Sequence, residues 1–143
     1  MTLIEAYRLK HAIPTVEDYL SLRMVAGLSP HDRAAAKAGL PNSIVSVIVE
    51  FESQTVAMGR IVGDGGLFFQ VCDIAVHPAH QGKGLGKAIM HELMDRLAQT
   101  LEAPAFVSLI ADGDANHLYA HYGFASVAPK SQGMARWLEP AAG

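Results

Sequence analysis

The chain has 143 residues, of which 50% are hydrophobic and 17% charged, and its formal net charge is -3. This length supports one domain with a proper core and is short for two, so we predict a single domain over residues 1–143. The composition is that of a soluble globular protein, and the absence of a basic excess argues against nucleic acid as a partner.

Cysteine content and apolar runs bear on the compartment. Cys72 is the only cysteine, so no disulfide can form within the chain and a reducing compartment is expected. The first twenty residues lack the basic start and the continuous apolar middle of a signal peptide. No apolar run approaches the roughly twenty residues that cross a bilayer. We therefore expect a cytoplasmic protein that does not interact with a membrane.

The first forty residues are predicted to hold a short strand and two helices. The strand is expected at Ala6 to Leu9. Thr15 is a suitable N-cap for a helix with a buried apolar face, which ends near Gly27. A shorter, alanine-rich helix is expected over Asp32 to Ala38 and closes at Gly39.

Three antiparallel strands are expected next. Asn42 to Phe51 is rich in Ile and Val, and Gln54 to Val62 reads as its hairpin partner across Glu52-Ser53. Asp64-Gly65-Gly66 is predicted to be a second hairpin turn, because residues that tolerate positive φ are needed there. Leu67 to Val76 forms the third strand of this group.

The second half of the chain alternates helices with strands. Apolar residues recur every four positions from Gly84 to Thr100, which predicts a helix that packs on the sheet. A strand over Ala105 to Ile110 must run parallel to the strand before this helix, because a helical crossover joins parallel neighbours. A helix from Ala115 to Tyr122 follows, and Phe124 to Val127 and Ala135 to Leu138 are predicted as weaker terminal strands.

A glycine-rich turn separates an apolar strand from the long helix. Gly82, Gly84 and Gly86 let the backbone approach a ligand closely, and the helix offers unpaired N–H groups and the positive end of its dipole to an anion. Lys83 and Lys87 add positive charge. The spacing fits neither a Walker loop nor the dinucleotide-binding Gly-x-Gly-x-x-Gly pattern. The turn therefore predicts a phosphate cradle of another kind, with a plain strand-to-helix connection as the alternative.

Two motifs carry a resemblance to a known family. Gln81-Gly82-Lys83-Gly84-Leu85-Gly86 matches the Gln/Arg-x-x-Gly-x-Gly/Ala signature of the Gcn5-related N-acetyltransferase (GNAT) superfamily. Leu118-Tyr119-Ala120-His121-Tyr122-Gly123-Phe124 resembles the family's later Leu-Tyr-x-x-x-Gly-Phe marker. The chain resembles this family in detail from about Ile44 to Phe124. The resemblance implies an α/β fold with a mostly antiparallel central sheet, splayed between the fourth and fifth strands and flanked by helices.

The resemblance also implies acetyl-CoA as the cosubstrate and no metal. In the family, the pantetheine arm lies in the gap between the splayed strands and pairs with the strand backbone. The glycine loop holds the pyrophosphate through main-chain N–H groups. The residues implied to bind the cofactor are Ile74, Ala75, Val76, Gln81, Gly82, Lys83, Gly84, Leu85, Gly86 and Lys87.

Acetyl transfer to an amine needs a neutral nucleophile, stabilisation of the oxyanion and a proton for the departing thiolate. Tyr119 matches the tyrosine that gives this proton in many relatives; Tyr122 is its competitor, and the alternative is that both are packing aromatics. Asp73 interrupts an apolar strand, which indicates a general base, a substrate anchor or a structural ion pair. His77 and His80 are the alternative bases.

The acceptor site is implied to lie among the segment Arg23 to Pro30, the Gly63 to Gly66 hairpin and the tail around Met134 to Trp137. Arg23 and Arg60 are candidates to bind a carboxylate or phosphate on the acceptor, and surface ion pairs explain them equally well.

We expect direct transfer, in a ternary complex, to the primary amine of a small molecule. A catalytically silent acyl-CoA-binding module and a protein or peptide acetyltransferase are the alternatives. Relatives frequently dimerise through late strands, which favours a homodimer.

Overall fold

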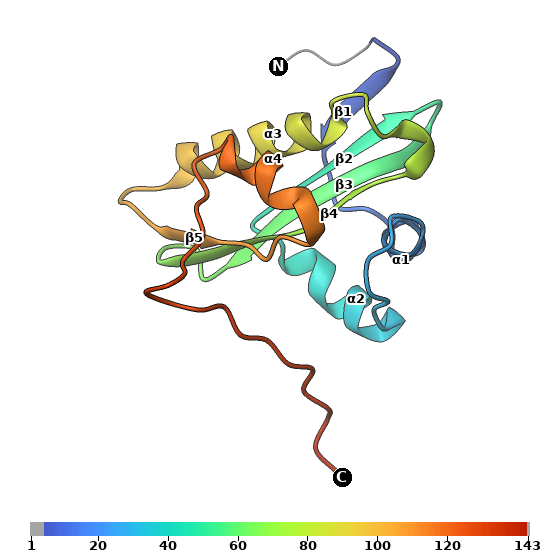
Figure 1. Cartoon of the computed structure of the whole chain (residues 1–143). Helices are drawn as coiled ribbons and strands as arrows, with labels where there is room; N and C mark the ends of the chain where they lie inside the picture. Colours follow the sequence, from blue (N-terminus) through green and yellow to red (C-terminus); the bar gives the residue numbers. More distant parts are fainter. Residues whose placement is uncertain (1–4, 143) are drawn as a thin grey trace.

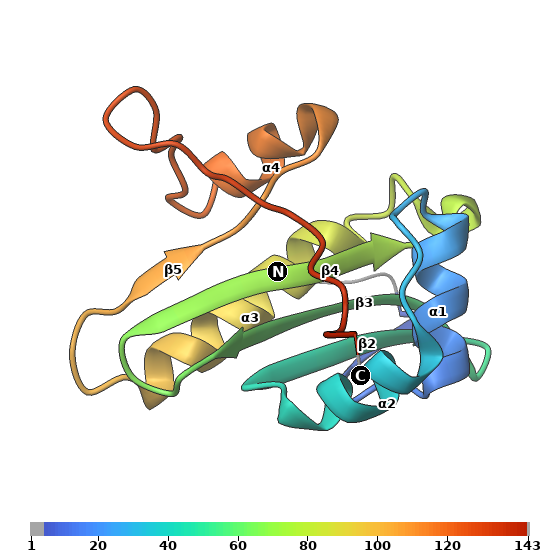
Figure 2. The same ribbon diagram turned by 90° about the horizontal axis from the view of Figure 1, so that it is seen from below.

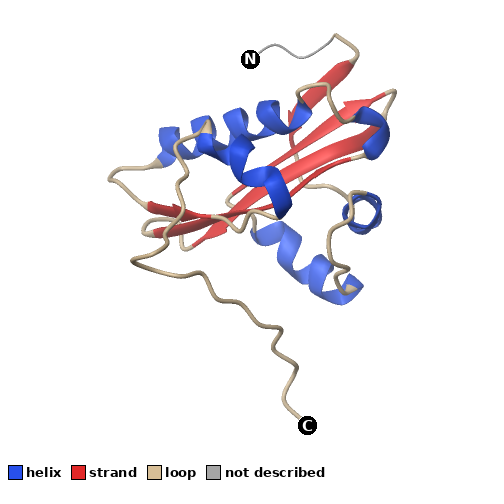
Figure 3. Ribbon diagram, viewed as in Figure 1, coloured by secondary structure: helices blue, strands red, loops and turns tan. Residues whose placement is uncertain are grey.

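A computed structural model describes residues 5–142, arranged in three layers. Helices α3 and α4 lie on one side of a central sheet, and α1 and α2 lie on the other (Figures 1 and 3). The sheet contains, in this order, β1 (Tyr7–His11), β2 (Val45–Phe51), β3 (Gln54–Gly63), β4 (Phe68–Val76) and β5 (Phe106–Ser108). The helices are α1 (Val16–Val25), α2 (Arg33–Gly39), α3 (Leu85–Thr100) and α4 (Asn116–Ala120), with short 3-10 turns at Leu40–Asn42, Pro78–His80 and Gly113–Ala115.

The sheet is mixed and opens on one side. Strands β1 to β4 are antiparallel neighbours, and β5 runs parallel to β4, as predicted. Only three residue pairs join β4 and β5, the last of them Gln70 with Ser108. From Val71 onward, no strand in residues 5–142 pairs with that edge of β4. Figure 2 shows β5 and the segment leading to α4 leaving β4, so the predicted splay is confirmed.

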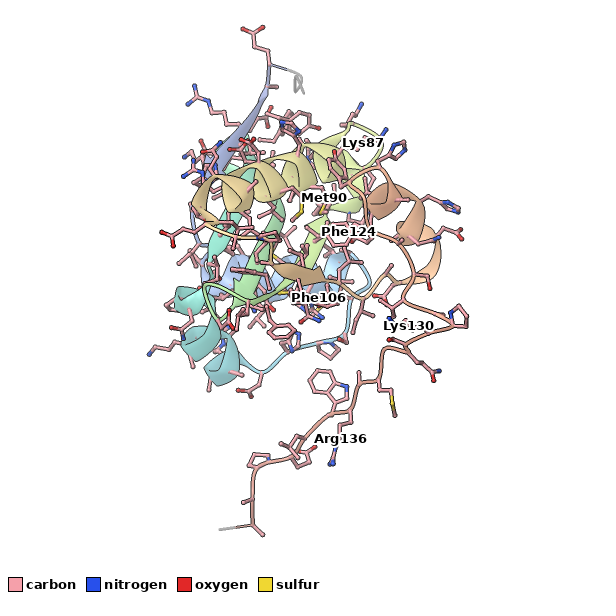
Figure 4. All side chains as sticks on the ribbon, turned by 90° about the vertical axis from the view of Figure 1, so that its left-hand side faces the viewer. Lys87, Met90, Phe106, Phe124, Lys130 and Arg136 are labelled. Carbon is pink, nitrogen blue, oxygen red and sulfur yellow. The ribbon has the colours of Figure 1, made fainter. Side chains whose placement is uncertain are left out.

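Two separate cores hold the helices to the sheet. On one face, α3 buries residues spaced four apart against β2 and β3: Leu85, Ile89, Leu93 and Leu97. Met90 of the same helix, labelled in Figure 4, is also fully buried. On the opposite face, Tyr19 and Leu22 of α1 pack with Ala36 of α2 on the sheet. The helix that the four-residue period predicted is therefore confirmed.

A β-bulge in β4 decides which side chains reach each face. Two residues, Asp73 and Ile74, lie opposite the single residue Gly59 of β3. Asp73 has φ 60°, the left-handed conformation that a bulge accommodates. A Cβ on Gly59 would lie 2.5 Å from Cγ2 of Ile89 and 2.6 Å from Cδ1 of Ile74, so only glycine lets α3 approach the sheet here.

The predicted terminal strands are wrong. Phe124–Val127 and Ala135–Leu138 have no regular secondary structure, and the chain passes β5 and then extends away from the sheet to the C-terminus (Figure 1). Trp137 and Leu138 are 68% and 80% exposed. β-prone residues form a strand only where a neighbouring edge pairs with them, and this segment has none among the described residues.

Smaller differences concern element boundaries. The first strand is Tyr7–His11, because five residue pairs with β2 fix its register. A 3-10 turn occupies Leu40–Asn42, so β2 begins at Val45 and not at Asn42. Helix α4 covers five residues and is preceded by a 3-10 turn. No helix in residues 5–142 is both long enough and apolar enough to span a bilayer.

Candidate active site

The loop between β4 and α3 presents unpaired backbone N–H groups. Gly82 and Gly84 have φ of 77° and 81°, and Gly84 is the N-cap of α3. No described residue accepts a hydrogen bond from the N–H groups of residues 82–87. A Cβ on Gly82 or Gly84 would meet nothing within 4 Å, so space for a ligand lies against this backbone. Six such N–H groups at a helix N-terminus have the geometry that can bind an anion, and the phosphate cradle stays a prediction.

The surroundings of the loop fix its shape. The side chains of Lys83 and Lys87 are exposed and bring positive charge to the cradle. Nε2 of Gln81 donates to the carbonyl oxygen of Val76 at 3.2 Å and so ties the loop to the end of β4. A Cβ on Gly86 would lie 3.5 Å from Cδ2 of Leu118, which shows how closely α4 packs on the first turn of α3.

The two tyrosines of α4 and its C-terminal turn differ in their hydroxyl groups. Tyr122 donates a hydrogen bond to the carbonyl oxygen of Lys87 at 2.8 Å. No described residue hydrogen-bonds the hydroxyl of Tyr119, whose ring contacts that of Phe124 edge-on. Burial and the nearby Asp112 carboxylate raise the pKa of Tyr119. Tyr119 therefore stays protonated at neutral pH with its proton free for donation.

Asp73 lies at the centre of a buried ionic cluster. Its Oδ1 accepts from Nη1 of Arg23 at 2.6 Å and from the Tyr19 hydroxyl at 2.9 Å, and its Oδ2 accepts from Nε of Arg60 at 2.6 Å. The Asp73 side chain is 6% exposed. Burial alone would raise the pKa of Asp73, but the hydrogen bonds and charges of Arg60, Tyr19 and Arg23 outweigh it and lower that pKa.

The cluster brings together Asp73, Arg23 and Arg60, which the sequence singled out separately. A carboxylate with three donors and a lowered pKa is a weak proton acceptor, so these contacts favour pairing or anchoring over general-base catalysis. The burial of the ion pairs also excludes the surface salt bridges that were the alternative for the two arginines.

The two arginines are not equivalent. Arg23 uses all three of its nitrogens: Nε donates to the Ser29 carbonyl oxygen at 2.9 Å, Nη2 to the Ser29 hydroxyl at 3.0 Å and Nη1 to Asp73. Arg60 donates from Nε to Asp73 and, at 3.3 Å, from Nη1 to the Ser43 hydroxyl. No described residue accepts from Nη2 of Arg60, whose side chain is 17% exposed.

A cavity of about 270 Å³ adjoins the cluster, between the sheet and the first two helices. The bulge turns both Cys72 and Asp73 toward it. Burial and the Asp73 charge raise the pKa of Cys72 to about 11, so its thiol is neutral. The lining residues are Tyr19, His31, Ala35, Ala36, Gly39, Leu40, Arg60, Cys72 and Asp73.

His31 is a cavity residue that sequence reasoning missed. Its ring stacks on Tyr19, with centroids 6.2 Å apart, and contacts Trp137 of the tail at 5.5 Å. Burial and the positive charge of Arg23 lower the pKa of His31, so its imidazole is neutral at pH 7. A lone histidine in a loop after Ser-Pro carries no sequence pattern that would have marked it.

The alternative bases His77 and His80 have other partners. Nδ1 of His77 accepts from the Ala79 N–H at 3.1 Å and caps the 3-10 turn after β4. Nδ1 of His80 lies 2.8 Å from the hydroxyl of Tyr7, the first residue of the edge strand β1. Neither histidine lines the cavity.

Comparison with known proteins identifies the family. Residues 42–126, more than half of the chain, match the family model described as the acetyltransferase (GNAT) domain. The chain belongs to the GNAT acetyltransferase family. A crystal structure from meticillin-resistant Staphylococcus aureus, described as a protein of unknown function and probable acetyltransferase, is 41% identical with a TM-score of 0.88. That match covers 92% of this chain and 99% of the other.

Two curated relatives with more than 30% identity match over shorter stretches of the chain. An uncharacterized N-acetyltransferase of Porphyra purpurea is 35% identical over 83 residues, which is 57% of this chain and 47% of that relative. The chloroplastic GCN5-related N-acetyltransferase 2 of Arabidopsis thaliana is 31% identical over 83 residues, or 58% of this chain and 31% of that relative. The chain spans about half the length of the first curated relatives it matches.

Proposed function

We propose that this GNAT protein is an acetyl-CoA-dependent N-acetyltransferase that moves the acetyl group directly to a primary amine of a small molecule in a ternary complex. The observation that carries the proposal is the row of six N–H groups at residues 82–87 without acceptors. They follow the end of β4, whose last residues, 71–76, have no pairing strand on the β5 side. An elongated anion with a diphosphate fits this combination of a cradle and an adjoining open strand edge.

The loop and the strand edge offer groups that suit acetyl-CoA. The backbone of Gln81, Gly82, Lys83, Gly84, Leu85 and Gly86 would hold the diphosphate, with the charge of Lys87 beside it. The edge of β4 at Ile74, Ala75 and Val76 would pair with the pantetheine amides, because β3 occupies only its other edge. When bound, acetyl-CoA supplies an acetyl group activated as a thioester.

Tyr119 is the proposed proton donor for the departing thiolate. It lies on α4, which packs on the first turn of α3 at the cradle. Its raised pKa keeps the phenol protonated, and its hydroxyl has no partner among the described residues that would have to be released first. Tyr122 is less suited, because its hydroxyl holds the Lys87 carbonyl.

The amine must lose a proton before or during attack, and we assign the proton acceptor to His31. A neutral imidazole in the cavity can take this proton. The Asp73 carboxylate is ionised, but it already accepts hydrogen bonds from three donors. Asp73 then serves as an anchor: it fixes Tyr19, Arg23 and Arg60 around the cavity. The cavity is accordingly the proposed acceptor site.

The test is calorimetric titration of the folded protein with acetyl-CoA and CoA. In Gly84→Val, a β-branched residue at φ 81° distorts the cradle and the side chain fills the ligand space, so affinity should fall by about tenfold or more. Gly65→Val is the matched control, because Gly65 has φ 88° and open space but lies in the hairpin before β4. Its affinity should equal that of the parent, and equal binding by Gly84→Val would refute the cradle.

The alternatives are separated by turnover. Binding of acetyl-CoA without thiol release on any amine or peptide would indicate a silent acyl-CoA-binding module. Release with peptides and not with free amines would indicate a protein acetyltransferase. The single domain over residues 1–143, the homodimer and the cytoplasmic location stay predictions from the sequence.

A further inference from the structure

The cavity beside Asp73 has a size that restricts its ligand. At about 30 Å³ per water in the liquid, 270 Å³ corresponds to about nine waters, hence to a ligand of about nine non-hydrogen atoms. Its walls come from α1, the loop and helix after it, β3 and the bulge of β4. A small aliphatic molecule fits this space.

The charges around the cavity do not cancel. The fixed charges are those of Arg23, Arg60 and Asp73, which sum to +1. The other ionisable groups of the lining, His31, Cys72 and Tyr19, are neutral at pH 7. Among the exposed charges nearby, Arg33 pairs with Glu17, and Asp32, whose carboxylate accepts from the Ala35 N–H, offsets Lys37. A buried excess of positive charge favours an anionic ligand.

Only Arg60 can supply this attraction directly. Every nitrogen of Arg23 is committed to Asp73 or Ser29. Arg60 is held in place by Asp73 through Nε, while Nη2 has no acceptor among the described residues and the side chain lines the cavity. Asp73 therefore orients a guanidinium whose Nη2 group has no acceptor among the described residues and can donate to an acid group.

Resting on the acetyl transfer proposed above, we propose that the acceptor is a small aliphatic amine that also carries an acid group, which Arg60 binds. Carboxylate and phosphate share the chemistry that Arg60 recognises. The acid group lies against Arg60, and the amine at the other end of the molecule is left to react. An amine without an acid group leaves the Nη2 donors of Arg60 unpaired in a half-buried site and is disfavoured.

The test compares acceptors of nearly equal shape by thiol release from acetyl-CoA. We expect kcat/KM for 4-aminobutyrate to exceed that for its neutral isostere 4-aminobutanamide by about tenfold or more, because a charge-assisted hydrogen bond is lost in the amide. A parallel measurement with 2-aminoethyl phosphate, and with ethanolamine as the smaller acceptor that lacks the acid group, shows whether phosphate is accepted as well as carboxylate. Equal rates within both pairs would overturn the proposal while leaving acetyl transfer intact.

Variants assign the preference to Arg60. In Arg60→Gln the ratio of acid to neutral acceptor should fall to about one, whereas Arg60→Lys, which keeps the charge, should retain part of the preference. Arg33→Gln is the control, because Arg33 is an exposed arginine outside the cavity, and its ratio should equal that of the parent. Thermal unfolding checks that each variant folds. An unchanged ratio in Arg60→Gln would refute the role of Arg60.

A binding measurement decides the matter if no acceptor reacts. Equilibrium dialysis of 4-aminobutyrate and 2-aminoethyl phosphate against the protein saturated with CoA should show binding. Both Arg60→Gln and Arg60→Lys should weaken this binding, and Arg60→Gln should weaken it more. No binding of either acid would overturn the proposal. A failure of CoA itself to bind, seen by calorimetry, would instead refute the proposed function, and acid binding to the protein alone would then still test Arg60.

Discussion

Replacing Asp73 by Asn separates an architectural role from a catalytic one. The substitution keeps the size of the side chain and removes the charge that binds Arg23 and Arg60. The native carboxylate accepts hydrogen bonds from the guanidinium groups of both Arg23 and Arg60. The amide of Asn has only one acceptor oxygen, so its NH2 group would face one of these two guanidinium groups, donor against donor. The protein then retains two partly or fully buried cations without a counter-ion.

The structure sets the expected size of the effect. Breaking a buried ion pair by removing one partner costs about 3–5 kcal/mol, and the partial exposure of Arg60 favours the lower end, about 3 kcal/mol. With about 3 °C per kcal/mol for a chain of this size, the unfolding midpoint should fall by about 10 °C. Denaturant unfolding and thermal circular dichroism measure both quantities. Asp95→Asn, at an exposed position of α3, should leave the midpoint unchanged within about 1 °C.

The stabilisation by Asp73 should depend on pH in a defined direction. Its pKa is lowered in the folded protein, so the unfolded chain takes up the proton first as pH falls. The stability difference between the parent and Asp73→Asn is therefore full above the ordinary carboxyl pKa of 3.8 and shrinks as pH falls through the lowered folded value. An Asp73→Asn protein that unfolds like the parent but has lost acetyl transfer would refute this reasoning and restore Asp73 as the base.

Three further predictions concern single side chains. Tyr119→Phe should lower kcat by about a hundredfold and leave the affinity for acetyl-CoA unchanged. Tyr122→Phe should instead lower the free energy of unfolding by about 1 kcal/mol, because its hydrogen bond to the Lys87 carbonyl is lost. Similar kcat values for the two variants would contradict the assignment of Tyr119 as proton donor. His31→Gln should lower kcat at pH 7 and above and remove the part of the fall in kcat below pH 6.5 that protonation of His31 causes, since the pKa of His31 is lowered from that value; a kcat profile that superimposes on the parent's would exclude His31 as proton acceptor. Cys72, with its pKa raised to about 11, should react with iodoacetamide at pH 8 roughly a hundredfold more slowly than an ordinary thiol, and a rapid reaction would show that it is not buried as neutral thiol.

The elements that were predicted correctly are those that their own local residue pattern determines. The four-residue apolar period defined α3, Thr15 acts as the expected N-cap of α1, and the long crossover implied the parallel β4–β5 pair. The tail could not be predicted in this way. Its apolar residues from Phe124 to Leu138 have β-strand character, but a strand also needs a partner edge, and local sequence does not contain that information.

The candidate site shows the same division between local and long-range information. The cradle at residues 82–87 is a local structure of glycines before a helix, so its pattern was readable. The cluster of Asp73 with Arg23 and Arg60 joins residues that are 50 and 13 positions apart, and only the folded sheet brings them together. His31 lines the cavity because of the course of the α1–α2 loop, and no residue pattern in the sequence predicts that course.

The bulge opposite Gly59 would let one strand contribute to both proposed sites, the cavity for the acceptor and the open edge for acetyl-CoA. A regular strand alternates its side chains, so Cys72 and Asp73 would lie on opposite faces. The inserted residue turns both toward the cavity, while Ile74 returns to the α3 face and the following backbone edge stays open toward β5. The charged lining of the cavity and the free strand edge are therefore adjacent along the chain. A larger residue at position 59 would displace Ile74 and α3, and with α3 the cradle, so both halves of the site depend on one glycine.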